Sequence, residues 1–331
     1  MTDLAVAVLF TGVLLYAVLG GADFGAGFWD LTAGGLARGR RPRRFIDTSI
    51  GPVWEANHVW LIFSLVAAWT TFPAAFAAVM TTLYLPLGLG AFGIVLRGSG
   101  FAFRRVVVRT DERRVTSAVF ELSSVITPFF LGTVVGALAS GRVPAQGGGD
   151  ALRSWLGPTS LLAGVLAVAG CANLAAVFLH RDARLRHAPA LERYFRRRVR
   201  ASTAVVVALS AAGLAVLAAD AHRLFTRLLG PGLPLVLLAI ASGTAALLTL
   251  RARGRRLAPA LAMVSMVCVV LGWGVAQYPY LLGTHLTVAQ AAAPRATLVA
   301  VAVVFAVAVV VCVPSLVLLY VLHDRGRLAD A

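Results

Sequence analysis

Four ionisable side chains inside the long apolar stretches of this 331-residue chain could carry protons: Asp23, Glu55, His58 and Glu121. Ionisable groups are costly in a lipid bilayer, and they mark ion paths, cofactors or buried partners. Glu55 and His58 are three residues apart, so they share one face of a helix. A buried carboxylate beside an imidazole suits proton uptake. The alternative for Glu55 is a satisfied polar group that helps helices to pack.

Asp23 lies among small residues. Gly21 and Gly25 are four residues apart and are followed by Gly27, a pattern that allows two helices to approach closely. We therefore predict that these glycines serve helix packing. Within such a contact Asp23 could be a proton relay or a buried hydrogen-bond anchor, and the pattern does not separate the two.

His58 could instead bind a haem or a metal ion. The other histidines lie at helix ends or in loops, and only His180 is expected at a matching depth as a second haem ligand. The three cysteines show no metal-ligand or redox spacing, which predicts small buried hydrophobic residues at Cys171, Cys268 and Cys312. We find no nucleophile motif and no phosphate-binding loop.

The composition indicates that most of the chain lies in lipid. Hydrophobic residues make up 59% of the chain and charged residues 13%, with a mean hydropathy of +0.85. A soluble protein of this size could not bury so much apolar surface, so the sequence predicts a polytopic membrane protein. The net charge of +16 does not indicate nucleic-acid binding, because the arginines fall between the apolar stretches.

Apolar stretches long enough to cross a bilayer predict an all-α fold of nine transmembrane helices in a single membrane domain, residues 1–331. We expect two groups of four helices (1–4 over about 5–139, and 5–8 over about 158–277) and a ninth helix near 296–322. The stretches lie near residues 5–28, 52–72, 75–96, 117–139, 158–180, 201–219, 231–250, 257–277 and 296–322.

The arginines predict the orientation. Of the 30 basic residues, all arginine, 25 fall in alternate loops and in the C-terminal tail. The positive-inside rule then places the N-terminus outside and the C-terminus in the cytoplasm. This count assigns Arg97 to the loop after the third helix. It also places Asp23, Glu55, His58 and Glu121 in the cytoplasmic half of the membrane.

Two motifs carry a resemblance to a known family. The first is Gly-Gly-Ala-Asp-Phe-Gly-Ala-Gly at residues 20–27, and the second is Gly-Pro-Val-Trp-Glu-Ala-Asn-His-Val-Trp at residues 51–60, which contains Trp54, Asn57 and Trp60. Weaker matches occur at Thr127-Pro128 and Tyr278-Pro279. With these motifs the chain resembles subunit II of the cytochrome bd-type quinol oxidases, including the cyanide-insensitive variants.

The resemblance implies a division of labour. The partner, subunit I, carries the b-type and d-type haems and the loop that oxidises quinol. The present chain would then be a haem-free accessory subunit of the bacterial cytoplasmic membrane, with no catalytic residue and no metal ligand. It would stabilise the heterodimer and supply a cytoplasmic proton route. A structural quinone in this chain and a small third subunit stay open.

The resemblance also implies site residues. Glu55 is the family's candidate residue for the proton route, and Trp60 lies where we expect the oxygen path. Two positions depart from the family pattern: Ala102 stands where many members carry an acid, and His58 is another polar residue in some members.

Rival functions remain at this stage. A proton-coupled secondary transporter could use Asp23 and Glu55 as its substrate site. A haem-binding membrane cytochrome could use His58 and His180. A purely structural membrane scaffold is the third alternative.

Overall fold

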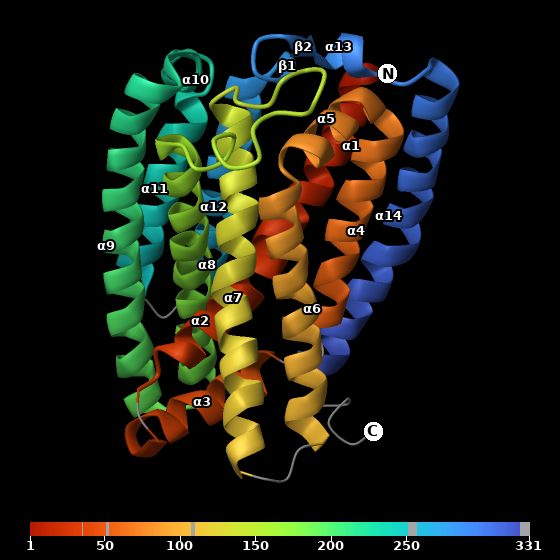
Figure 1. The fold of residues 1–331 in the computed structure, drawn as a ribbon. Coiled ribbons are helices and arrows are strands. Elements are labelled where there is room, and N and C mark those ends of the chain that lie inside the picture. Colours follow the sequence, from red (N-terminus) through yellow and green to blue (C-terminus); the bar gives the residue numbers. More distant parts are fainter. Residues whose placement is uncertain (35, 51–52, 107–109, 251–256, 325–331) are drawn as a thin grey trace.

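The computed structural model describes residues 1–34, 36–50, 53–106, 110–250 and 257–324, and this part of the chain is almost entirely helical (Figure 1). Most helices run side by side, and a short hairpin of two strands lies near the N-terminus. The elements are α1 (Thr2–Leu15), η1 (Tyr16–Gly20), α2 (Gly21–Leu31), α3 (Leu36–Ile50), α4 (Val53–Thr71), α5 (Pro73–Thr82), α6 (Tyr84–Val106), α7 (Thr110–Ala139), α8 (Pro158–Leu185), α9 (Pro189–Asp220), α10 (His222–Leu229), α11 (Leu233–Thr249), α12 (Leu257–Gln277), β1 (Tyr280–Leu282), β2 (Leu286–Thr287), α13 (Val288–Ala291) and α14 (Arg295–Asp324).

All nine predicted stretches fall on helices in the described ranges, although the stretch near 75–96 is divided between two helices. Among the residues that the structure describes, six helices are long and apolar enough to cross a membrane, and the number reaches eight if each of two bent helix pairs is one span. The first span is continuous from Thr2 to Leu31 and contains the π-helical segment η1. The all-α membrane fold predicted from the sequence is confirmed, whereas the count of nine crossings, the orientation and the two groups stay predictions.

The predicted helix over 75–96 is wrong. Phe72 leaves the helical conformation before Pro73, α5 ends at Thr82, and a new helix, α6, begins at Tyr84. Proline lacks an N–H group and disfavours helical geometry in the residue before it, so the chain bends by 118° between α4 and α5. As a result, α6 extends ten residues beyond the predicted end of this helix.

The ends of the bundle differ in charge. The C-terminal end of α6, the N-terminal end of α7, the junction of α8 with α9 and the crosswise helix α3 lie together (Figure 1). We call this the arginine-rich end, because these segments carry most of the arginines, and it is the end predicted to be cytoplasmic. The N-terminus, the 140–157 segment, α10 and the β-hairpin lie at the opposite end.

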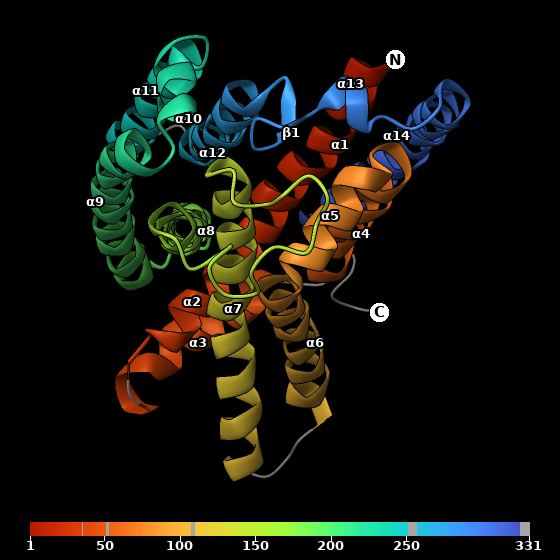
Figure 2. The ribbon, with the colours of Figure 1, turned by 45° about the horizontal axis from the view of Figure 1, so that its top comes forward.

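The core is centred on α2. This helix packs against both α7 and α8, while α6 packs along α7 and α9 along α8 (Figure 2). Buried residues of α2, α3, α8, α9, α11 and α12 form one apolar cluster, and a second one joins α1, α5 and α7 to the hairpin and to α14. The position of α2 between α7 and α8 is what places Asp23 in the interior.

Candidate functional site

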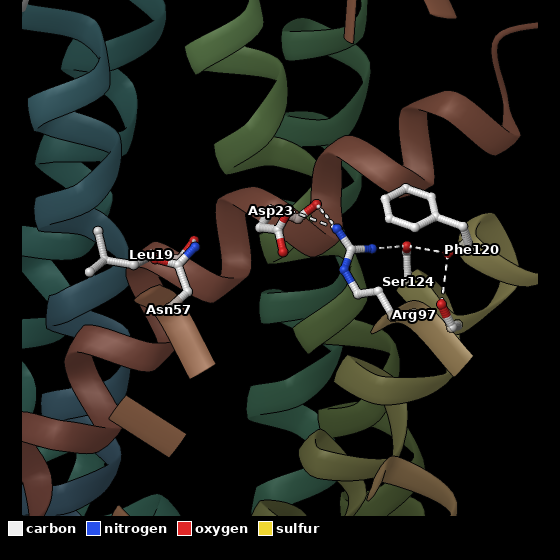
Figure 3. Close-up of polar contacts among 7 residues, drawn as sticks. Leu19, Asp23, Asn57, Arg97, Phe120 and Ser124 are labelled. Atoms are coloured by element: carbon white, nitrogen blue, oxygen red, sulfur yellow. Dashed lines mark hydrogen bonds and ion pairs between the residues drawn. The ribbon is translucent and has the colours of Figure 1, made fainter. Parts of the chain in front are cut away.

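A buried ion pair lies at the centre of the α2–α6–α7 contact. Arg97 of α6 and Asp23 of α2 are 1% and 6% exposed. Arg97 Nη2 lies 2.7 Å from Asp23 Oδ1 and also donates to the Asp23 carbonyl oxygen at 3.1 Å (Figure 3). A buried charge needs such a partner, because the low-dielectric interior strongly penalises a lone ion.

The rest of the guanidinium group contacts α7. Its Nη1 donates to the Ser124 hydroxyl, which in turn donates to the Phe120 carbonyl oxygen at 2.7 Å (Figure 3). The Phe120 and Phe24 rings lie 4.3 and 5.0 Å from Arg97 Cζ, within the range of cation–π attraction. Three helices are thereby joined through one side chain.

Arg97 does not lie in a loop, as we predicted from the sequence. The loop was expected there because the apolar stretch ends at residue 96. The chain leaves the helical conformation at Phe72 and again at Leu83. The helix that contains Arg97 therefore begins only at Tyr84 and continues to Val106, so Arg97 lies well inside α6. The signal in the sequence for a buried arginine was Asp23, since an intramembrane carboxylate requires a basic partner.

A second charged group lies nearer the arginine-rich end. Arg43 of α3 places its Nε 3.6 Å from Asp30 of α2 and 4.0 Å from Glu121 of α7. Asp30 is fully buried and Glu121 nearly so, whereas the Arg43 side chain is 28% exposed. Arg43 is thus the member of this group that reaches solvent.

The two charged groups lie along one contact between α2 and α7. Asp23, Gly27 and Asp30 are spaced i, i+4 and i+7 on α2, and Glu121 and Ser124 are spaced i and i+3 on α7, so each set shares a helix face. A methyl group on Gly27 would collide with the Ser124 hydroxyl and lie 3.1 Å from Arg97 Nη1. We call this set of polar residues the α2–α7 seam: Asp23, Asp30, Arg43, Arg97, Glu121 and Ser124.

The other glycines of α2 face α8. A methyl group on Gly25 would collide with the backbone carbonyl of Cys171, and one on Gly21 would lie 3.5 Å from Cys171 Sγ. The helices therefore touch backbone to backbone at Gly25, which is the close approach that small residues allow.

The motif at the start of α4 contacts the first span. Asn57 donates its side-chain amide to the Leu19 carbonyl oxygen in η1 at 3.2 Å. The His58 ring lies edge-on to the rings of Tyr16 and Phe24, at centroid distances of 6.2 and 6.3 Å. Trp60 is buried. The side chains of Trp54 and Glu55 lie outside those that the structure describes.

His180 does not suit a haem ligand. It is buried, and its Nδ1 and Nε2 lie 3.2 and 3.5 Å from the carbonyl oxygens of Glu192 and Leu250. Both ring nitrogens of His180 thus face backbone carbonyl groups. The aromatic rings next to His58 belong instead to the first span. No group of three or more His, Cys, Asp or Glu residues that could hold a metal ion occurs among the described residues.

Fold and site together define a polytopic α-helical membrane protein with a charged seam in its interior. The model of the family of cytochrome bd terminal oxidase subunit II matches residues 1–323, so the chain belongs to that family. The resemblance drawn from the two motifs is confirmed. This assignment argues against the transporter and the membrane cytochrome as functions of the chain.

Individual relatives match parts of the chain. It is 34% identical over 136 residues to the cytochrome bd ubiquinol oxidase subunit 2 of Bacillus subtilis (strain 168), covering 41% of this chain and 38% of that protein. It is 31% identical over 181 residues to the cytochrome bd-I ubiquinol oxidase subunit 2 of Escherichia coli (strain K12), covering 52% and 46%. These matches span less than half of each relative.

A solved structure supports the fold over nearly the whole chain. The bd oxidase structure from Geobacillus thermodenitrificans contains a chain that superposes with a TM-score of 0.78, covering 96% of this chain and 97% of that one. The sequence identity is 24%, so this similarity concerns the fold.

Proposed function

We propose that this chain is the accessory subunit of a bacterial membrane complex that oxidises quinol and reduces O2 to water, and that it carries protons along the α2–α7 seam. The haems b and d belong to subunit I, which this chain stabilises as a heterodimer. The observation that carries the proposal is the buried row of charged side chains in a member of this family.

The proposed reaction in the partner subunit determines how many protons must be supplied. Reduction of one O2 to two waters takes four electrons from quinol and four protons. If those protons come from the cytoplasm while quinol releases its protons outside, turnover conserves energy across the membrane. A subunit with acids open to the cytoplasmic side would serve the first half of this scheme.

The order of the polar residues along the α2–α7 seam supports this role. Glu121 and Asp30 can accept protons near the arginine-rich end, where Arg43 is partly exposed. The Ser124 hydroxyl, three residues after Glu121 on α7, accepts a hydrogen bond from Arg97, which pairs with Asp23. Arg97 compensates the charge of Asp23 in the interior, and Gly27 leaves room for this contact.

The motif in α4 supplies a second route to the same region. Glu55 and His58 begin a helix that touches the first span through Asn57. We propose that Glu55 and His58 take up protons there, with Trp54, Asn57 and Trp60 holding the helix in position. The two routes would meet near Asp23.

Substitution of each acid tests the proposal and separates the routes. We expect the double variant Glu121→Gln, Glu55→Gln to slow O2 consumption by the purified complex by about tenfold or more, with unchanged haem spectra and subunit ratio. Each single variant should slow it less, because the other route stays open. Asp220→Asn at the opposite end is the control and should keep full turnover. A loss in the Glu55 variant as large as in the double variant would remove the seam as a route, and normal turnover in the double variant would exclude proton transfer through this chain.

A further inference from the structure

Helix α3 lies across the arginine-rich end of the bundle instead of running along it (Figure 1). Its inner face is buried: Phe45 and Ile46 belong to the apolar cluster with α8 and α9, and the Phe45 ring lies 5.8 Å from that of Phe195. A helix with one apolar and one basic face at the end of a membrane bundle has the character of an interfacial helix.

The arginines of α3 divide into two sets. Arg43 turns inward to Asp30 and Glu121. Arg40, Arg41 and Arg44 are exposed and share the outer face, at spacings of three and four residues. Among the described residues, no carboxylate lies within ion-pair distance of these three guanidinium groups.

A fourth exposed arginine extends this face from another helix. Arg186 follows α8 and donates to the hydroxyl and the carbonyl oxygen of Thr48 at 3.0 and 3.2 Å, while its Cζ lies 5.2 Å from the centre of the Phe45 ring. These contacts fix the end of α3 to the bundle, so the outer face is held in place. We call Arg40, Arg41, Arg44 and Arg186 the α3 basic face.

We propose that the α3 basic face binds the headgroups of anionic phospholipids in the adjoining leaflet. The guanidinium group presents paired N–H donors that match phosphate oxygens, and it keeps its charge at any physiological pH. A helix lying in the interface brings these donors to the depth of the headgroups, while Phe45 and Ile46 hold it on the protein. Each basic residue near an anionic surface contributes about 1 kcal/mol, so three that act together discriminate strongly against neutral lipid.

Lipid competition on the purified complex, or on the chain alone if it has no partner, tests this proposal. The measured lipid preference does not depend on oxidase activity. The probe is spin-labelled phosphatidylglycerol, measured against spin-labelled phosphatidylcholine in vesicles of unlabelled phosphatidylcholine. We expect a preference for phosphatidylglycerol that falls at least about tenfold in the triple variant Arg40→Gln, Arg41→Gln and Arg44→Gln. The preference should persist with added inorganic phosphate, which separates a lipid site from a free-phosphate site.

Two further variants keep the test specific. Arg193→Gln, Arg197→Gln and Arg200→Gln remove the same charge from exposed positions of α9 at the same end. An equal loss in both triple variants would show a diffuse field and overturn the site on α3. Replacement of Arg40, Arg41 and Arg44 by lysine keeps the charge and should retain most of the preference. No preference in the unaltered protein would mean that these arginines serve only to orient the chain during insertion.

Discussion

Two arginine–aspartate pairs in this protein use the same chemistry in different surroundings. Arg97 and Asp23 meet in the interior, with side chains 1% and 4% exposed, whereas Arg142 and Asp220 meet near the opposite end, with side chains 29% and 17% exposed. Asp220 also accepts from the Thr159 hydroxyl at 2.6 Å. Water can replace either partner of the outer pair but not of the inner one, so burial decides how much each pair matters.

The largest effect is expected for the inner pair. Arg97→Gln leaves Asp23 buried without its counter-charge, and we expect a loss of about 3–5 kcal/mol in the free energy of unfolding. Thermal unfolding in detergent and the yield of assembled complex measure this loss. The double variant with Asp23→Asn should regain part of it, because the isolated charge is then removed. A double variant no more stable than the single one would contradict a direct ion pair.

A smaller loss is expected from filling the seam at its narrowest point. Gly27→Ala places a methyl group against the Ser124 hydroxyl and the Arg97 guanidinium, and we expect it to cost about 1–3 kcal/mol. Gly88→Ala on α6 is the matched control, since a methyl group there meets no atom within 4 Å. Thermal unfolding of both variants measures the difference, and equal stability would show that α2 and α7 can separate without cost.

The outer pair should matter less. We expect Arg142→Gln to cost about 1 kcal/mol or less, with a difference from the unaltered protein that shrinks as salt is added. Thermal unfolding at low and high ionic strength measures both quantities. A loss as large as that of Arg97→Gln would contradict the role that the comparison gives to burial.

The smallest effect is expected at a fully exposed acid in the 140–157 segment. The backbone N–H groups of Arg153 and Leu152 donate to Asp150, and they lower the pKa of its carboxyl below the usual value. A lowered pKa means that the stabilisation is present above the ordinary pKa of aspartate, about 4, and is lost as the pH falls through the folded value. Asp150→Asn should therefore speed amide exchange at Arg153 near pH 7, while the exchange rates in α2 stay unchanged. Unaltered exchange at Arg153 would contradict this turn.

The positions of most helices could be predicted from the sequence, but the buried position of Arg97 could not. Hydropathy located the helices well, and α12 begins and ends where it was predicted, because lipid-facing helices must be continuously apolar. The buried position of Arg97 was not predicted because this residue lies directly after an apolar run. It becomes an interior residue of a helix only because the chain bends before Pro73. A bend depends on tertiary contacts as well as on proline; here the N–H of Ala293 donates to the Thr71 carbonyl oxygen at 2.8 Å.

The charged groups of the seam were predicted only in part. Asp23 and Glu121 stood out as acids within apolar stretches. The contribution of Arg43 could not be seen, because a segment with five arginines and Pro42 reads as a loop. It forms α3 since Phe45 and Ile46 have an apolar cluster to pack against, and that cluster is assembled from distant parts of the chain.

The buried position of Arg97 has a consequence for how the protein is made. An arginine near the middle of a helix opposes insertion by about 2.5–3.5 kcal/mol on the scale measured at the translocon. Helix α2 is synthesised before α6, so Asp23 leaves the ribosome earlier than Arg97. The order of the two residues in the chain therefore lets the earlier helix assist the entry of the later one during biogenesis.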